Sequence, residues 1–112
     1  MDNRTDLQII AEIKKDRNVD DNLTVIIERH SGIYLDMVNA YSTEDSPFIN
    51  RRELIQDKEL KIYEAIIKYD ETKGAKFSTY LGNETKWMCL NTYNKNRRKP
   101  LITVDYIENL SD

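Results

Sequence analysis

The sequence predicts an all-α protein, a compact bundle of about four helices. At 112 residues and 13.3 kDa the chain is long enough for one domain with a modest core and too short for two. Glycine and proline are scarce, at 3 and 2 residues, whereas a β-sandwich needs frequent turn residues. Apolar residues recur at three- and four-residue spacings and 33% of residues are charged, which is typical of amphipathic helices with a hydrated outer surface.

The first expected helix is short. It begins after a capping residue, Thr5 or Asp6, and ends near Lys15. A polar segment, residues 16–21, follows it, so residues 1–21 are predicted to form an N-terminal helix and a linker. The apolar positions of this helix are Leu7, Ile10 and Ile13.

The second expected helix, residues 22–41, has a regular amphipathic pattern. Its apolar stripe includes the histidine of the chain, which we expect to be a core or boundary imidazole and not a catalytic base. Residues 42–49, which include Pro47, then break the helix. The stripe consists of Leu23, Ile26, Ile27, His30, Tyr34, Met37, Val38 and Tyr41.

The third expected helix runs from Asn50 to about Tyr69. Asn50 and Glu53 lie three residues apart, a spacing that resembles a capping box. Residues 70–76, centred on Gly74, are expected to form a loop. The inward stripe of the helix is predicted to consist of Ile55, Ile62, Ile66 and Tyr69.

The fourth expected helix starts at Ser78 or a neighbour, runs to about Asn96 and stops before Pro100. At 100° per residue it has an apolar face, expected in the core, and a second face that mixes aromatic rings with amides and charges. The second face buries poorly, so its rings are either exposed or packed partly under the 42–49 segment or the first helix. The core face comprises Leu81, Thr85, Met88 and Thr92, with Phe77 before it; the second face comprises Tyr80, Glu84, Trp87, Asn91, Asn94 and Arg98.

Charge is distributed unevenly along the chain, whose net charge is −3. Residues 1–72 carry ten basic and sixteen acidic side chains, whereas residues 73–99 carry seven basic and one acidic. Residues 100–112 carry three acidic side chains and no basic one. A basic helix flanked by acidic surface can bind nucleic acid in a fixed orientation. The alternative is a solvated helix end whose cations face the C-terminal dipole.

We expect no enzyme activity, cofactor or metal site. Cys89 is the single cysteine, which excludes an internal disulfide and a multi-thiolate metal site, and we expect its thiol to be buried. Residues 70–74 faintly resemble a calcium loop but lack its fifth-position ligand and sixth-position glycine. Because no signal peptide or long apolar run occurs, a cytoplasmic protein without a membrane role is expected.

Three segments in order, ELIQD (53–57), AIIKYD (65–70) and KGAKFSTY (73–80), resemble conserved region 2 of the bacterial housekeeping-type (sigma-seventy) sigma factors. The pattern of that family reads approximately D-L-I-Q-E-G, then A-x-x-K-F-D, then R-G-x-K-F-S-T-Y. The resemblance covers about residues 22–105, with the region 2-like domain at 22–100 and the start of an acidic linker at 101–112. It is more specific than a single short motif.

The resemblance implies a surface that binds core RNA polymerase. In the family the corresponding helix docks on the clamp helices of the largest catalytic subunit, where acidic and amide groups give directional contacts to an arginine-rich coiled coil. Without the resemblance, Glu53 would simply cap its helix and the other side chains would be solvated. The implied polymerase-binding residues are Glu53, Gln56, Asp57, Glu59, Leu60 and Tyr63.

The resemblance also implies contact with the promoter −10 element. Family members capture unpaired bases of the non-template strand against aromatic rings, and stacking contributes about 1–3 kcal/mol per base. Phe77, Thr79 and Tyr80 would be the capture residues, although Phe77 also lies near the core face and would there support the pocket instead. Lysine and arginine side chains would contact phosphates. The implied DNA-binding residues are Lys76, Phe77, Thr79, Tyr80, Asn83, Lys86, Trp87, Asn91, Arg97, Arg98 and Lys99.

The chain departs from the family pattern at the melting surface. Primary sigma factors usually carry aromatic residues at the positions of Ala75, Asn83 and Glu84, and these wedge the edge of the bubble. Trp87 stands where the family often has a glutamine that reads the first −10 base pair, and Asn91 replaces a basic residue. We therefore expect weaker autonomous melting or an altered −10 sequence, as in an alternative or phage-encoded sigma factor. Whether Trp87 takes over the wedge role is left open.

Three functions follow from the sequence. The first is a transcription initiation domain that binds core RNA polymerase and melts the −10 element, in the cytoplasm of a bacterial or phage-infected cell, with an anti-sigma factor as a further partner. The second is a sigma-like regulator or decoy that binds the clamp without melting DNA. The third is a helical protein-interaction domain. The −35-binding domain is expected on a longer chain or on another protein.

Overall fold

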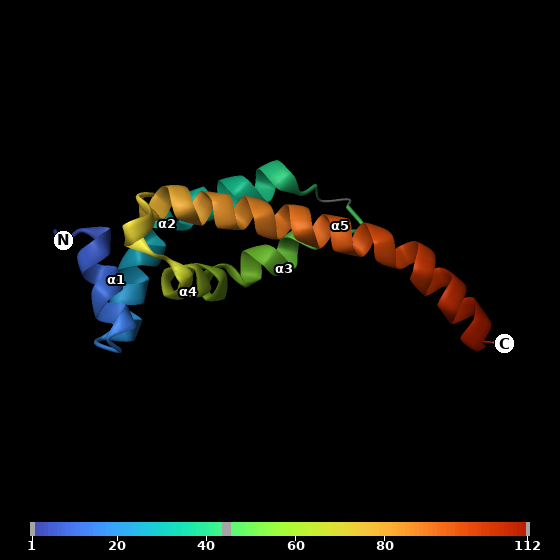
Figure 1. Ribbon diagram of the computed structural model, residues 1–112, viewed down its shortest axis with the longest axis horizontal. Helices are drawn as coiled ribbons and strands as arrows, with labels where there is room; N and C mark the ends of the chain where they lie inside the picture. The colour runs from blue at the N-terminus through green and yellow to red at the C-terminus, as the bar shows by residue number, and fades with distance from the viewer. Residues whose placement is uncertain (1, 44–45, 112) are drawn as a thin grey trace.

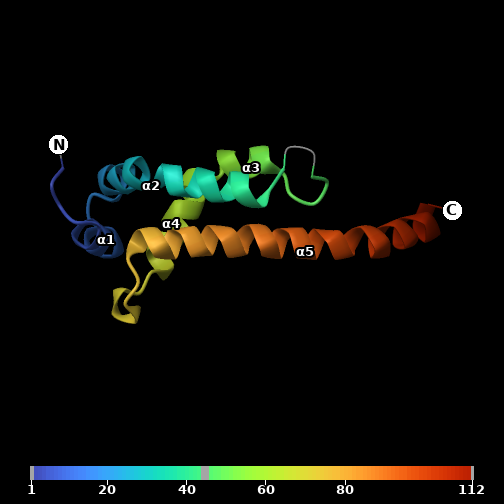
Figure 2. The same cartoon turned by 90° about the horizontal axis from the view of Figure 1, so that it is seen from above.

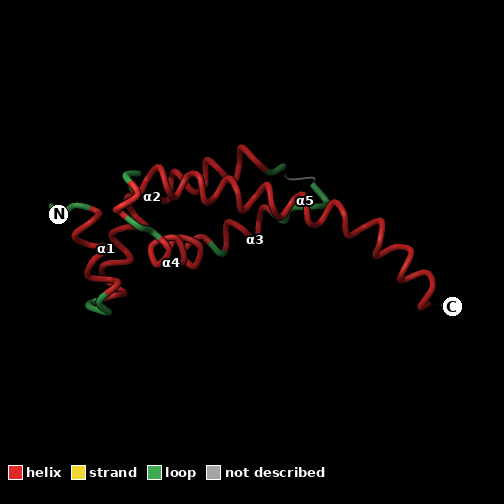
Figure 3. Tube along the Cα trace, viewed as in Figure 1, coloured by secondary structure: helices red, strands yellow, loops and turns green. Residues whose placement is uncertain are grey.

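The protein is an all-α bundle, as the sequence predicts. The structure is a computed structural model that describes the backbone of residues 2–43 and 46–111, and side chains up to Arg97. That part of the chain contains helices and loops and no strand (Figure 3). Its elements are α1 (Asp6–Lys14), α2 (Val19–Tyr41), α3 (Arg51–Gln56), α4 (Lys58–Lys68), the 3-10 helix η1 (Glu71–Lys73) and α5 (Phe77–Ser111).

Helices α2 and α5 lie side by side and form the long axis of the molecule (Figures 1 and 2). Helices α3 and α4 pack against α2, and α1 packs on α2 near the start of α5. The principal extents are 61 × 26 × 26 Å, because the last part of α5 projects beyond the body of the bundle. Ile33 and Met37 of α2 pack over Gly82 of α5, where a Cβ would lie at ordinary van der Waals distances of 3.6 Å from Ile33 Cγ2 and 3.7 Å from Met37 Cε.

A single hydrophobic core joins all the α-helices. Helix α1 supplies three isoleucines to it, so the N-terminal helix is built into the same core as the region that follows. Two expected core residues, His30 and Cys89, are buried. The buried hydrophobic side chains are Ile9, Ile10, Ile13, Ile26, Tyr34, Val38, Ile49, Leu54, Ile62, Ala65, Ile66, Tyr69, Phe77, Leu81 and Cys89.

Helix α1 begins with a capping box at Thr5. The Gln8 backbone N–H donates to Thr5 Oγ1 at 3.2 Å, and the Thr5 N–H donates to Gln8 Oε1 at 2.8 Å. Of the three expected apolar positions, Ile10 and Ile13 are buried, whereas Leu7 is exposed and Ile9 is buried as well. The buried side of α1 therefore shares two positions with the expected stripe and adds Ile9, which three-residue spacing from Leu7 does not include.

Helix α2 begins at Val19, three residues earlier than expected, after Asn18 in a left-handed conformation with φ 44°. Asn22, a polar residue outside the expected apolar stripe, is buried in the first turn of the helix, and both the oxygen and the nitrogen of its side-chain amide are hydrogen-bonded. Its Nδ2 donates to the Arg17 carbonyl at 2.9 Å, and its Oδ1 accepts from Arg4 Nη2 at 2.8 Å. Both partners come from polar segments flanking α1.

The single third helix that the sequence predicted is divided at Asp57 into α3 and α4. Asp57 has φ −87° and ψ 8°, so the backbone turns there although the hydrogen-bonded chain continues on both sides. The turn rotates α3, which makes Ile55 exposed and Leu54 buried, so the prediction for Ile55 is wrong. Tyr34 fixes this arrangement because its hydroxyl donates to the Leu54 carbonyl at 2.6 Å.

The expected end of the last helix before Pro100 is also wrong. Helix α5 continues to Ser111, through residues predicted to start an acidic linker, and bends toward its end (Figure 1). Proline removes one backbone donor and bends a helix, but it does not always end one. Residues 46–50 support the preceding turns: Asn96 Nδ2 donates to the Phe48 carbonyl at 2.7 Å, and the Phe48 and Tyr93 rings meet edge to face at 5.2 Å.

Candidate nucleic-acid and polymerase interfaces

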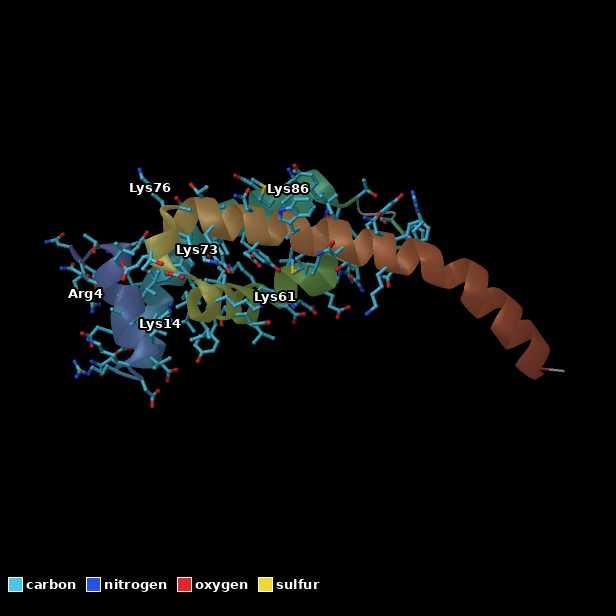
Figure 4. All side chains as sticks on the ribbon, in the orientation of Figure 1. Arg4, Lys14, Lys61, Lys73, Lys76 and Lys86 are labelled. Atoms are coloured by element: carbon cyan, nitrogen blue, oxygen red, sulfur yellow. The ribbon has the colours of Figure 1, made fainter. Side chains whose placement is uncertain are left out.

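A tight loop, residues 70–76, precedes α5 and carries Lys73 and Lys76. Asp70 accepts hydrogen bonds from the Thr72 N–H at 2.9 Å and from Thr72 Oγ1 at 2.6 Å, and these bonds lower the pKa of its carboxyl group. Gly74 then turns the chain with φ +86°, a conformation that favours glycine. Lys73 and Lys76 on this loop are exposed, and Figure 4 shows Lys76 at the start of α5.

Tyr69 connects the loop to three helices. Its hydroxyl donates to the Ala75 carbonyl at 2.6 Å, and its own carbonyl accepts from Lys14 Nζ of α1. Its ring lies 5.4 Å from the ring of Phe77, edge to face, and 5.4 Å from that of Tyr80. The first turn of α5 is therefore held in place by side chains from α1 and from the end of α4.

Phe77 lies in the core, where the alternative role expected for it, support of the pocket, would place it. It is 2% exposed, and its ring packs edge to face on His30 at 5.3 Å and on Tyr69. His30 in turn lies with Nε2 2.8 Å from Asp6 Oδ2. Phe77 therefore lies on the core side of α5, and its ring packs beneath the first turn of the helix.

The solvent face of α5 carries most of the other predicted DNA-binding residues. Trp87 is 56% exposed, and Thr79, Asn83 and Asn91 are exposed beside it. Tyr80 is half-buried against Tyr69; burial, and then the nearby Glu84 carboxylate, raise the pKa of its hydroxyl. At neutral pH that hydroxyl is therefore a hydrogen-bond donor on a partly exposed ring.

Two cations of α5, Lys86 and Arg97, lie next to aromatic rings. Lys86 Nζ lies 5.7 Å from the ring centroid of Tyr41 on α2 and 5.8 Å from that of Trp87. Arg97 Cζ lies 5.9 Å from the ring centroid of Tyr93. Each distance is within the range of a cation–π interaction. The side chains of Arg98 and Lys99, also predicted to contact DNA, lie outside the described residues.

Two adjoining cavities lie where α1 meets the loop and the start of α5. The larger, of about 370 Å³, is lined by the first residues of α1, by residues 74–76 and by Phe77 and Ser78. The smaller, of about 240 Å³, lies between α1 and Tyr69, with exposed Leu7 at its edge. Both border Tyr69, so α1, which lies outside the sigma-like segment, forms one wall of the space beside Lys76.

The predicted polymerase-binding residues lie along α3, the turn at Asp57 and α4. Leu60 is 55% exposed, Glu53, Gln56 and Glu59 are exposed, and Asp57 and Tyr63 are half-buried. Glu53 and Gln56 lie three residues apart on one side of α3, and Leu60 and Tyr63 lie three residues apart on one side of α4. With Asp57 at the turn between the two helices, we refer to these five residues as the exposed row. Asn50 caps α3 through Oδ1, which accepts from the Glu53 N–H at 3.0 Å. The Glu53 backbone makes this bond, and its carboxylate lies on the exposed row.

Sequence reasoning missed three contributors to these surfaces. Tyr41 was assigned only to the apolar stripe of α2, Ile67 extends the exposed row of α4 with 47% exposure, and Tyr69 was treated only as a core position. Ile67 could have been found from the sequence, because it follows Tyr63 by four residues and Leu60 by seven and so lies on the same side of the helix. The other two depend on contacts between distant segments, which spacing does not encode.

Among the residues with described side chains, no group of three or more His, Cys, Asp or Glu is arranged to hold a metal ion. None of the helices in the described part of the chain is long and apolar enough to cross a membrane.

Comparisons of the chain with protein-family models, with curated proteins and with solved structures found no match. The similarity to sigma region 2 therefore depends on the three motif segments and their order along the chain.

Proposed function

We propose that this chain is a transcription initiation module that binds core RNA polymerase and captures unpaired bases of a promoter −10 element. The observation that carries the proposal is the division of α5 into two faces. Phe77, Leu81 and Cys89 are buried on one face, whereas Trp87, partly exposed Tyr80 and nearby cations occupy the other. Exposed rings combined with phosphate-binding cations are the elements of a single-strand binding surface.

The polymerase-binding part of the proposal is supported by the exposed row on α3 and α4. It mixes carboxylates with Leu60 and Ile67, which are both about half-exposed. Carboxylates guide association with a basic partner, while the apolar side chains supply area to bury. This row and the α5 surface belong to different helices, so one chain can engage the polymerase and a DNA strand together.

A regulator that binds the polymerase without melting DNA is the second candidate. The burial of Phe77 favours it, because one of the three expected capture residues is committed to the core. Ala75, Asn83 and Glu84 add no aromatic ring to replace it. The two candidates share the polymerase-binding row and differ in single-strand binding.

The first experiment measures binding of the purified chain to bacterial core RNA polymerase. A Gln56→Ala/Asp57→Lys variant reverses charge on the row, and we expect it to weaken binding at least tenfold. Asp36→Lys, at an exposed position on α2, makes the same charge change away from the row and serves as the matched control. Wild-type binding that both variants retain would refute this surface, and absence of binding to any core enzyme, including that of the source organism, would refute the function.

The second experiment separates the two candidates. A fluorescently labelled single strand carrying a −10 element is titrated with the chain, with the corresponding duplex as control. Initiation predicts preferential single-strand binding that Tyr80→Ala weakens about 5- to 140-fold, the equivalent of about 1–3 kcal/mol of stacking. Polymerase binding without single-strand binding would support the regulator.

A further inference from the structure

Tyr41, Lys86 and Trp87 form an aromatic and cationic cluster where the end of α2 meets α5. Lys86 Nζ lies 5.7 Å from the Tyr41 centroid and 5.8 Å from the Trp87 centroid, so the ammonium group has a ring on each helix as a neighbour. Within the described part of the chain, no carboxylate lies within 4.0 Å of this Nζ. Figure 4 shows Lys86 beside the far end of α2, away from Lys76.

The cluster is open to solvent. Trp87 is 56% exposed, the highest value among the exposed large hydrophobic side chains of the described residues, while Tyr41 and Lys86 are half-buried. Interactions with Tyr41 and Trp87 restrict the otherwise mobile lysine side chain. A planar apolar surface and an ammonium group with no carboxylate partner among the described residues are thus presented together to a ligand that binds there.

A nucleotide matches both groups. A base can stack on the indole ring, and its phosphate can accept hydrogen bonds from the ammonium group. The surrounding face of α5 adds exposed Asn83 and Asn91, whose amides can donate to and accept from base edges. A folded protein partner would instead favour a larger contiguous apolar patch around Trp87.

We propose that Tyr41, Lys86 and Trp87 form a second stacking platform that holds an unpaired nucleobase, with Lys86 on the adjoining phosphate. The inference rests on the proposed function and adds a site on α2 and α5 to the first turn of α5. Trp87 follows Tyr80 by seven residues, about 10 Å along the helix axis. That distance is about three times the spacing of stacked bases, so the two rings serve different nucleotides.

Trp87 itself reports on this site because it is the only tryptophan in the chain. Its intrinsic fluorescence is followed while single-stranded DNA is added to the wild-type chain at low salt, and the anisotropy of an end-labelled strand gives the dissociation constant in parallel. Stacking predicts quenching that saturates at the same DNA concentration as the anisotropy change. A duplex of the same sequence is expected to quench weakly, because its bases are already stacked.

Variants separate stacking from charge. Trp87→Ala is expected to weaken single-strand binding about 5- to 140-fold, whereas Tyr41→Phe, which keeps the ring, changes it less than twofold. Lys86→Ala is expected to reduce the slope of log affinity against log salt by about 0.7, the value for one single-strand phosphate contact. Ile55→Ala removes an exposed apolar side chain from α3 and is the matched control, with less than a twofold effect expected.

Three results would overturn the inference. The first is strand binding that anisotropy detects without quenching of Trp87, or with the same affinity in a folded Trp87→Ala variant. Either observation would refute the stacking platform but not the proposed function. Equal quenching by the duplex would indicate phosphate contacts without base stacking. Absence of strand binding at low salt would refute both the platform and single-strand capture. The wild-type fluorescence result does not depend on whether any variant folds.

Discussion

Replacement of Phe77 by leucine tests whether this ring supports the α5 surface or touches DNA. The ring is 2% exposed and makes edge-to-face pairs with His30 at 5.3 Å and Tyr69 at 5.4 Å. Loss of two such pairs costs about 1–3 kcal/mol, and the void beside a smaller side chain adds about 1 kcal/mol. We therefore expect Phe77→Leu to lower the free energy of unfolding by about 2–4 kcal/mol.

The variant should nevertheless fold, because a domain of this length is stabilised by about 6–17 kcal/mol. Urea unfolding followed by circular dichroism measures the loss, and anisotropy of a labelled single strand measures DNA affinity under conditions where the variant is folded. We expect the free energy of unfolding to decrease while the affinity for the single strand stays within about threefold of wild type. If the variant keeps its stability and loses DNA binding, Phe77 contacts DNA directly and must leave the core when the strand binds.

Other predictions concern the helices and the core. Gly32→Ala should raise the free energy of unfolding by about 0.5–1 kcal/mol, measured by urea titration, since a Cβ at this exposed position in α2 meets nothing within 4 Å; a loss of stability would contradict this. Tyr34→Phe should cost about 1–3 kcal/mol in the same assay, because it leaves the buried Leu54 carbonyl without the hydroxyl that donates to it. Cys89 should react with Ellman's reagent only as the chain unfolds, and prompt reaction of the native protein would refute its burial. Burial raises the pKa of the Cys89 thiol, so its contribution to stability is complete below about pH 8.5, the pKa of an unfolded thiol, and is lost as pH rises through the folded pKa; urea titrations above and below that pH measure this loss.

Much of the fold could be predicted because it depends on local chemistry. A cap at Thr5, one of the two expected candidates, and the stripe through Ile26, His30, Tyr34 and Val38 follow from side-chain type and spacing, and the structure confirms both. The division at Asp57 could not be predicted in this way, because residues on both sides of it favour a continuous helix. The bond from Tyr34, twenty residues away along the chain, selects Leu54 over Ile55 for the core.

The candidate surfaces could likewise be predicted where they depend on local spacing and not where they depend on contacts between distant segments. Exposure of Trp87 and Asn91 follows from helical periodicity, which separates them from Leu81 and Cys89. The position of Tyr41 beside Lys86 depends on how α2 crosses α5, and a sequence pattern within one helix contains no information on that crossing. The sigma-like assignment itself remains a proposal that the binding experiments decide.

The contacts of α1 determine how short a functional piece of this chain can be. A fragment starting at residue 22, where the sigma-like segment begins, would lose Asp6 beside His30 and Lys14 beside the Tyr69 carbonyl. It would also expose the core surface that the three α1 isoleucines cover, which favours self-association. The smallest autonomous unit therefore starts upstream of the motif-bearing region, and a transplant of residues 22–97 into another protein would need a substitute for α1.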